Sequence, residues 1–229
     1  MTNRPVALVT GATRGIGRAI AVELSSTHRI LVGGRDAARV GELVAELGDA
    51  APFVCDLADE DAVATACAGI GRLDVLVHSA GIGRSDDIGA ASRALWYEVF
   101  ETNVFAVADL TRLLLPALEA AQGIVVAINS GAGFFSSPGG GVYAGSKFAL
   151  RALTDALREE VRGKVRVCSI HPGRTDTDMQ RELQAAMGNE HYDGSRYVSP
   201  GSVAAAVRLA VDTPGNATVE QLSIRPSVF

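Results

Sequence analysis

The amino-acid sequence predicts an α/β protein with one doubly wound parallel sheet of about seven strands and helices on both faces. Seven short, almost wholly apolar runs recur along the chain, as expected of strands that are covered on both sides. Segments with helical periodicity separate these runs from end to end, which favours parallel strands joined by right-handed crossovers. No linker interrupts this alternation, so we expect a single domain over residues 1–229.

The expected strands are Pro5–Val9, Ile30–Val32, Pro52–Cys55, Leu73–Val77, Ile124–Ile128, Val165–Ile170 and Val219–Ile224. After the first strand, Ile16, Ile20 and Leu24 recur on one helical face. The next helix is expected to begin after Asp36, which is a capping residue type, and to end at Gly48.

Two longer helices are predicted further along the chain, near residues 92–121 and 142–162. Pro116 lies inside the first of them. Because proline has no backbone donor, we expect it to bend this helix or to end its regular part.

The composition excludes several classes of protein. With 48% hydrophobic residues and a net charge of −5, the chain has enough apolar material for a full core and is not disordered. No apolar run reaches the roughly 20 residues that span a bilayer. The sequence has no cluster of Lys and Arg, which argues against nucleic acid as a partner. The three cysteines are widely spaced, which predicts buried thiols and a cytoplasmic location.

A glycine-rich turn follows the first strand directly and opens the first helix, over Thr10–Gly17. Its glycines, Gly11, Gly15 and Gly17, would let the backbone approach a pyrophosphate held at the helix N-terminus. Tight turns also need glycine, but the place between strand and helix favours a dinucleotide site.

The residues after the second strand bear on which dinucleotide binds. Asp36 stands near the position where an NAD site has a carboxylate for the ribose hydroxyls, but helix capping already accounts for it. Arg14 and Arg35 could both reach a 2′-phosphate, since a guanidinium suits phosphate oxygens. The alternative is two solvated loop arginines. We favour NADP(H) over NAD(H).

Tyr143 and Lys147 stand four residues apart at the start of a predicted helix, so their side chains point to the same side. A free tyrosine has a pKa near 10, and about 4 kcal/mol of phenolate stabilisation would bring it to 7. A nearby ammonium is one expected source. Ser130 ends the fifth strand, at the sheet edge where open α/β sheets bind ligands, and could donate to a substrate oxygen there.

Several of these motifs occur together in a fixed order, and with them the chain resembles the short-chain dehydrogenase/reductase family, NADP-preferring type, over its whole length. This resemblance implies a Rossmann-type domain. The matching pieces are Thr10–Gly17, Asp56, Leu73–Gly81, Asn103, Ser130, Tyr143 with Lys147, and Pro172-Gly173 followed by Thr175 and Thr177.

The resemblance implies a catalytic role for four residues. Tyr143 would be the general acid/base that exchanges a proton with the alcohol or carbonyl oxygen. Lys147 would lower its pKa and hold the nicotinamide ribose, and Ser130 would orient and polarise the substrate oxygen. Asn103 would fix a water that links Lys147 to solvent; a polar residue bonded within the helix is the alternative.

The resemblance also implies a set of cofactor-binding residues. Asp56 would contact the adenine, unless it caps the next helix. Thr175 would meet the nicotinamide carboxamide, with Thr177 as a rival by position. The full set is Gly11, Thr13, Arg14, Gly15, Ile16, Gly17, Arg35, Asp56, Leu57, Ala80, Gly81, Tyr143, Lys147, Pro172, Gly173 and Thr175.

The histidines do not add a metal site. His78-Ser79 stands where the family usually has two asparagines, so we expect altered bonding around the fourth strand rather than lost catalysis. His171 beside Pro172 is interpreted as structural. His28 and His191 lack partners at metal-ligand spacing, so no zinc site is expected.

Residues 174–197 are expected to form a lid over the substrate pocket. Met179, Leu183 and Met187 recur every four residues, which predicts a small amphipathic helix there. Gly131–Gly141, with Phe134 near Ser130, should line the other side. This lining favours a small or medium carbonyl or alcohol substrate.

The sequence therefore predicts an NADP(H)-dependent oxidoreductase that moves a hydride between the nicotinamide and a carbonyl or alcohol. One alternative is a regulatory protein that senses NADPH without turnover, and another is an interaction protein on the same scaffold. No membrane partner is expected. The two long helices commonly join subunits in the family, so the resemblance implies a homodimer or homotetramer.

Overall fold

Seven parallel strands form one sheet, as the sequence predicts, and the structure adds their order, β3-β2-β1-β4-β5-β6-β7. The computed structural model describes residues 4–186, 188–189 and 191–227. The strands are β1 (Val6–Val9), β2 (Arg29–Gly34), β3 (Ala50–Val54), β4 (Val75–His78), β5 (Ile124–Ile128), β6 (Arg166–Pro172) and β7 (Gln221–Ile224). Each lies within three residues of an expected run.

Helices connect the strands: α1 (Gly15–Ser25), α2 (Ala37–Leu47), α3 (Glu60–Cys67), α4 (Arg93–Phe100), α5 (Ala106–Ala121), α6 (Gly141–Glu160), α7 (Asp178–Ala186) and α8 (Pro200–Asp212). The expected caps of α2 are confirmed. The Asp36 carboxylate accepts from the backbone N–H groups of Ala38 and Arg39, and Gly48 ends the helix at a φ of 75°.

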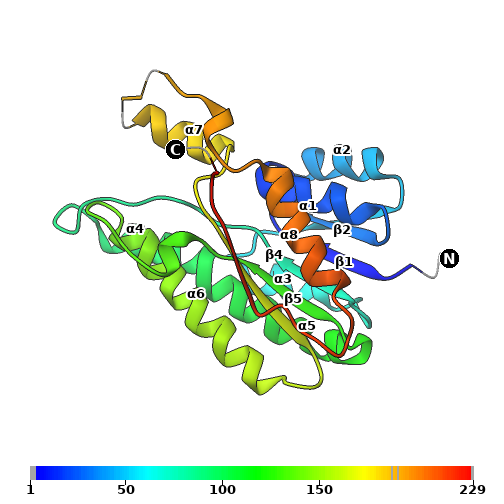
Figure 1. Cartoon of the computed structure of the whole chain (residues 1–229). Helices are drawn as coiled ribbons and strands as arrows, with labels where there is room; N and C mark the ends of the chain where they lie inside the picture. The colour runs from blue at the N-terminus through cyan, green and yellow to red at the C-terminus, as the bar shows by residue number, and fades with distance from the viewer. Residues whose placement is uncertain (1–3, 187, 190, 228–229) are drawn as a thin grey trace.

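Helices cover both faces of the sheet (Figure 1). On one face, Ile20 of α1, Val40 of α2 and Val207 of α8 pack with strand residues in one apolar cluster. On the other face, Val63 of α3 and Leu114 of α5 belong to a second cluster. Strands enclosed in this way are apolar on both sides, which explains the continuous apolar runs of the sequence.

The helical segment expected over residues 92–121 is interrupted. Glu101–Phe105 form a π-helical turn between α4 and α5, and the buried Asn103 lies in it. Pro116 does not end the helix, because α5 runs through it to Ala121. The break therefore lies more than ten residues before the proline, at a position that the apolar pattern does not mark.

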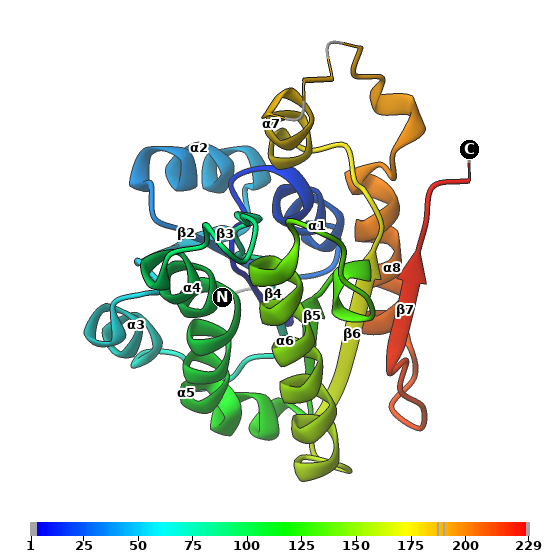
Figure 2. The ribbon, with the colours of Figure 1, turned by 90° about the vertical axis from the view of Figure 1, so that its left-hand side faces the viewer.

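The carboxyl ends of the strands lie at one edge of the sheet, at the top of Figure 2, and α7 lies beyond this edge. The chain order changes direction between β1 and β4, which is the kind of position where open α/β sheets bind ligands. In the part of the chain that the structure describes, no helix is both long and apolar enough to span a membrane.

Candidate active site

The turn between β1 and α1 is too tight for any residue but glycine at two places. Gly11 has a φ of 62°, a conformation that L side chains rarely adopt. At Gly17, a Cβ would lie 2.2 Å from the carbonyl oxygen of Gly11. The first turn of α1 therefore packs directly against the backbone of the preceding loop. This leaves the N-terminus of α1 with bare backbone, as a phosphate-binding turn requires.

Thr10 fastens this turn to the neighbouring strand. Its Oγ1 accepts from the backbone N–H groups of Ser79, at 3.0 Å, and Ala80, at 3.1 Å. The same hydroxyl donates to the carbonyl oxygen of Val77. Sequence reasoning missed this role, because the contact joins two segments that are distant along the chain. The loops after β1 and β4 are thereby held at one spacing.

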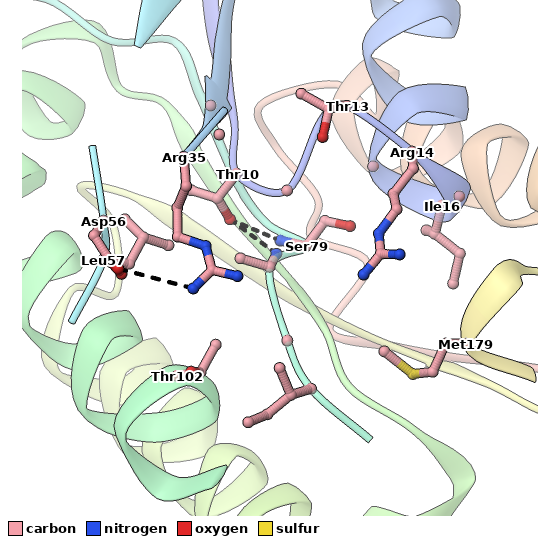
Figure 3. Close-up of a pocket in the computed structure, with 18 of the residues that line it drawn as sticks. Thr10, Thr13, Arg14, Ile16, Arg35, Asp56, Leu57, Ser79, Thr102 and Met179 are labelled. Atoms are coloured by element: carbon pink, nitrogen blue, oxygen red, sulfur yellow. Dashed lines mark hydrogen bonds and ion pairs between the residues drawn. The ribbon is translucent and has the colours of Figure 1, made fainter. Parts of the chain in front are cut away.

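A cavity of about 270 Å³ lies against this turn. Figure 3 shows it between the loops that follow β1, β2 and β4, with Met179 of α7 at its side. Eleven predicted cofactor residues line it: Gly11, Thr13, Arg14, Gly15, Ile16, Gly17, Arg35, Asp56, Leu57, Ala80 and Gly81. Lining residues that sequence reasoning missed include Phe53, Cys55, Ile82 and Thr102.

Two arginines reach into this cavity, and Figure 3 shows both guanidinium groups directed toward its centre. Arg35 lies 3.8 Å from a carboxylate oxygen of Asp56, and both side chains are more than half exposed. Asp56 does not cap α3, because that cap is Asp59. Asp36 caps α2 and is absent from the cavity lining. The cavity is therefore lined by two cationic side chains, Arg14 and Arg35, and not by Asp36, the carboxylate that could have bound the ribose hydroxyls.

The segment after β6 contributes Thr177 to the cavity lining and not Thr175. The Thr175 hydroxyl is buried and donates to the carbonyl oxygen of Gly173. Thr177 instead lies beside Gly15, its methyl carbon 3.4 Å from where a Cβ on that glycine would stand. Pro172 and Gly173 also lie outside the lining. Thr177, the rival by position, is the threonine nearer the glycine turn.

The side chains of Ser130 and Tyr143 form a hydrogen bond. Ser130 follows the carboxyl end of β5, and Tyr143 lies in the first turn of α6. Ser130 is extended at the end of the strand, and its Oγ accepts from the backbone N–H of Ala132 at 3.1 Å. Burial raises the pKa of Tyr143, and the hydrogen bond from Ser130 opposes that rise. The expected fall of this pKa toward 7 is not produced by these two influences.

Lys147 lies one turn along α6 from Tyr143, as predicted. Its ammonium is 5.8 Å from the centre of the Tyr143 ring and donates to the carbonyl oxygen of Ile128 at 3.1 Å. The side chain is buried, and this burial lowers the pKa of Lys147 from 10.5 to about 8. A buried ammonium of this kind is readily deprotonated, so Lys147 is suited to exchanging a proton.

Asn103 is held by three hydrogen bonds. Its side chain pairs with the backbone of Ile82, accepting at 2.9 Å and donating at 3.0 Å, and it also donates to the Ser146 hydroxyl. The Cβ position of Gly81 lies 3.1 Å from the Asn103 oxygen and 3.9 Å from the Lys147 ammonium. Gly81 therefore joins the cavity to the group formed by Asn103, Ser130, Tyr143 and Lys147.

His78 lies in β4 and faces α5. Its Nε2 is 2.8 Å from the Thr111 hydroxyl, which itself donates to the carbonyl oxygen of Val107. Nε2 is therefore the donor. Burial lowers the pKa of His78 to about 4, so the ring is neutral. This contact is the altered bonding expected around the fourth strand.

The expected amphipathic helix forms as α7, and its apolar side chains are partly exposed. Met179 and Leu183 are 41% and 46% exposed, whereas Gln180 and Gln184 are buried. Met187 lies outside the described residues. Met179 still lines the cavity, with its sulfur against Gly83. The apolar side of α7 thus faces the cavity and solvent, and its amides pack inward.

The return loop after α7 is fastened to Asp176. The Tyr192 hydroxyl donates to this carboxylate at 2.9 Å, and Arg181 of α7 forms an ion pair with it. The rings of Tyr192 and Tyr197 stack with centroids 4.8 Å apart. Polar contacts therefore hold this segment together. Among the described residues, no cluster of three or more metal-ligating side chains occurs.

Comparison with known proteins agrees with this arrangement. Residues 5–188 match the model of a family described as short chain dehydrogenase. The chain belongs to the short-chain dehydrogenase/reductase family. It is 34% identical to serine 3-dehydrogenase of Agrobacterium fabrum over 96% of this chain and 92% of that one.

Solved structures of short-chain dehydrogenases share the fold. The closed form of serine dehydrogenase complexed with NADP+ superposes with a TM-score of 0.88 at 27% identity, covering 96% of this chain and 94% of that one. An alcohol dehydrogenase from Thermococcus sibiricus complexed with 5-hydroxy-NADP gives a TM-score of 0.87 at 28% identity, covering 98% and 97%. The chain is thus a member of an oxidoreductase family whose similar structures include NADP complexes.

Proposed function

We propose that this protein is an NADP(H)-dependent oxidoreductase that transfers a hydride between the nicotinamide and a carbonyl or alcohol substrate. The observation that carries the proposal is the position of Gly81, where an added Cβ would lie 3.1 Å from the Asn103 oxygen and 3.9 Å from the Lys147 ammonium. Gly81 lines the glycine-rich cavity, so a dinucleotide bound there would end beside Tyr143 and Ser130. One continuous site then has a place for a cofactor and a place for a proton donor.

The cavity suits an NADP molecule. A turn that a Cβ would fill at Gly17 leaves room for a pyrophosphate, and backbone donors at the start of α1 would bind it. Arg14 and Arg35 would hold the 2′-phosphate, and Asp56 would face the adenine side. Thr177 supports the nicotinamide end better than Thr175 does, because it lines the cavity. We extend the proposed contacts to Ile16, Leu57, Ala80 and the Pro172-Gly173 turn.

In the reducing direction, NADPH would supply the hydride that adds to the carbonyl carbon of the substrate. Tyr143 would donate its phenolic proton to the carbonyl oxygen as the C–O double bond becomes single. The product is then an alcohol, and Tyr143 is left as a phenolate. Ser130 would hold the same oxygen, because its hydroxyl lies beside that of Tyr143 and could turn its proton from the Tyr143 oxygen to the substrate oxygen.

Lys147 would return the proton to Tyr143. Its ammonium lies beside the Tyr143 ring and has a pKa of about 8, which is close to neutral pH. The positive charge also stabilises the phenolate that catalysis forms. Asn103 would hold a water that links Lys147 to solvent. The π-helical turn around Asn103 is a local distortion of the kind that recurs at functional sites.

The test is a fluorescence titration of the purified protein with NADPH and NADH, followed by a panel of carbonyl compounds. Because relatives are named serine dehydrogenases, the panel should include 3-hydroxy amino acids, run with NADP+, beside ketones, aldehydes and 3-oxo esters. We expect tight NADPH binding and turnover with at least one compound. Tight binding without turnover would favour the sensing alternative.

The matched variant is Tyr143→Phe, which removes only the hydroxyl that Ser130 contacts. We expect turnover to fall by at least about 100-fold while NADPH binding stays within severalfold, because acid–base catalysis contributes roughly 10²–10⁴-fold. Full retained activity would contradict the mechanism. Tyr97→Phe, at a half-exposed side chain on α4, is the control.

We also propose that residues 174–197 act as the lid of a single domain, and that two or four copies associate. Support for association comes from the exposed aromatic residues Tyr97, Phe105 and Phe148 around α4 and α6. Light scattering coupled to size-exclusion chromatography would measure the assembly. The three buried free thiols support a cytoplasmic location.

A further inference from the structure

His171 lies next to last in β6 and is completely buried. Its Nδ1 is 3.1 Å from the backbone carbonyl oxygen of Ser130, at the end of the neighbouring strand. A carbonyl oxygen only accepts, so Nδ1 must carry the proton and donate it. The interpretation of His171 as structural, made from the sequence alone, did not foresee a contact with a catalytic candidate.

The surroundings of the ring favour this one tautomer. The other ring nitrogen, Nε2, has no hydrogen-bond partner among the described residues. A second proton there would be a buried donor without an acceptor, which is costly. Burial is the largest influence and lowers the pKa of His171. The bond to the Ser130 carbonyl and the Asp155 carboxylate oppose this fall, and the Arg151 and Arg225 guanidinium groups add to it. The ring is therefore neutral with its proton on Nδ1.

The ring is also fixed in place by its neighbours. The centroid of the Phe134 ring lies 4.3 Å from that of His171, and the Arg151 guanidinium lies over Phe134 at 4.5 Å. Behind the ring, Arg225 donates to the backbone carbonyl oxygen of His171 at 2.6 Å. His171 therefore offers a rigid donor to the residue that it contacts.

Ser130 receives its other backbone contacts from its own loop. Its N–H donates to the Asn129 side chain at 2.9 Å, and its carbonyl accepts from Gly133 at 3.0 Å. Its Oγ accepts from Ala132. Of these partners, only His171 reaches Ser130 from another strand. It therefore ties the loop that carries the Ser130 hydroxyl to the rigid sheet.

We propose that His171 is a positioning residue for the reaction: its Nδ1–H holds the Ser130 carbonyl so that the Ser130 hydroxyl stays directed at the Tyr143 oxygen. This inference rests on the proposed function, because it acts through the group that would hold the substrate oxygen. His171 itself touches neither substrate nor cofactor. Displacing the hydroxyl by about 1 Å would cost roughly 100-fold in rate.

The test compares two amides at this position. His171→Asn keeps an N–H donor at the place of Nδ1, whereas His171→Gln moves the amide one carbon further, toward the place of Nε2. We expect kcat within about 3-fold of wild type for H171N and a fall of roughly 10- to 100-fold for H171Q, with NADPH affinity unchanged in both. Equal losses in the two variants would overturn the proposal.

A second comparison places H171Q in a Ser130→Ala background. If His171 acts through the Ser130 hydroxyl, H171Q adds less than about a 3-fold loss once that hydroxyl is gone. A merely structural role predicts the same loss in both backgrounds, and that result would also overturn the proposal. Thermal unfolding of each variant shows whether the fold is retained.

A nitrogen NMR measurement keeps this inference separate from the proposed function. In the wild-type protein we expect the His171 ring to be neutral and protonated at Nδ1. A ring protonated at Nε2 would overturn the His171–Ser130 bond even in an active enzyme. Failure of the wild type to turn over any compound would instead overturn the proposed function, and with the expected tautomer present the two failures are distinguished.

Discussion

The Lys147 ammonium lies 5.8 Å from the centre of the Tyr143 ring, and both side chains leave the same side of α6. Burial lowers the pKa of Lys147 to about 8 and raises that of Tyr143. Each group is thus held in surroundings that disfavour its charged form. At neutral pH Tyr143 is uncharged, so the buried ammonium of Lys147 is the group that destabilises the fold.

Lys147→Met should stabilise the protein while it abolishes turnover. The fall of the Lys147 pKa from 10.5 to about 8 means that the buried charge destabilises the wild type by roughly 3 kcal/mol at neutral pH. The variant is relieved of this but loses the hydrogen bond to Ile128, which stabilises the wild type by about 1 kcal/mol. We therefore expect the free energy of unfolding to rise by about 2 kcal/mol at pH 7. Urea unfolding would measure it.

This gain depends on pH with a definite sign. Because the folded pKa lies below the unfolded one, the unfolded wild type binds more protons between pH 8 and 10.5. Wild-type stability then rises with pH in that window, and the advantage of Lys147→Met disappears. Lys164→Met, at an exposed ion pair with Glu119, is the control and should show neither effect. An unchanged advantage at high pH would contradict the burial argument.

Arg35→Asp should change the choice of cofactor. Loss of a guanidinium from the cavity should weaken NADPH binding by roughly 10- to 100-fold, because a hydrogen bond to a charged group contributes about 1.5–3 kcal/mol. NADH affinity should change by less than about 3-fold. Arg39→Asp makes the same charge change at an exposed arginine outside the cavity lining. Equal losses for both cofactors would return Arg35 to the role of a solvated loop residue.

His78→Asn should leave the rate unchanged and alter the pH dependence of stability. The His78 pKa is lowered from 6.5 to about 4, so the unfolded state takes up its proton first as pH falls. Wild-type stability is therefore full above pH 6.5 and loses roughly 3 kcal/mol from this group by pH 4.

The stability of the variant does not fall in this way at low pH. At pH 7.5 the variant is about 1 kcal/mol less stable than the wild type, because it lacks the hydrogen bond to Thr111. Denaturant unfolding at pH 7.5 and pH 5 would measure both effects. His191→Asn, at an exposed histidine, should leave the pH dependence as it is. A large loss of rate in a folded His78→Asn protein would show that His78 takes part in the reaction.

Of two glycine-to-alanine changes, one should weaken NADPH binding and the other should stabilise the protein. Gly17→Ala places a methyl group 2.2 Å from the Gly11 carbonyl oxygen, so the turn must open and NADPH binding should fall at least about 10-fold. Gly41→Ala meets nothing within 4 Å in α2 and should stabilise the protein by about 1 kcal/mol. Thermal unfolding and an NADPH titration measure the pair. Equal changes of NADPH affinity and of thermal stability in the two variants would contradict the close contact proposed between Gly17 and Gly11.

The glycine turn and the seven strands could be predicted because they depend on local patterns. Apolar runs identify enclosed strands, and a glycine turn between strand and helix specifies one edge of the sheet. The Thr10 contact to Ser79 could not be predicted in this way, since it joins residues 69 positions apart. Chain geometry brings them together only after β1 and β4 have paired.

Helix α7 shows a different limit. The spacing of Met179 and Leu183 indicates correctly that they share a side of α7, but periodicity cannot say which side turns inward. In the folded chain the buried side carries Gln180 and Gln184. The Asn189 amide donates to the Gln184 side chain, whereas Gln180 Nε2 has no partner among the described residues. The π-helical turn at Asn103 was likewise invisible, since tertiary contacts with Ile82 and Ser146 select it.

The parallel sheet also decides how the protein can be joined to other molecules. β1 starts at the amino edge of the sheet, whereas β7 ends at the carboxyl edge, where Arg225 and Pro226 touch the Gly173 turn. A fusion partner or surface linkage placed ahead of Val6 would stand on the far side from the cavity. The same attachment placed after β7 would stand at the carboxyl edge, which is the edge that carries the cavity, so immobilisation through the N-terminal end is the arrangement that keeps the support away from that edge.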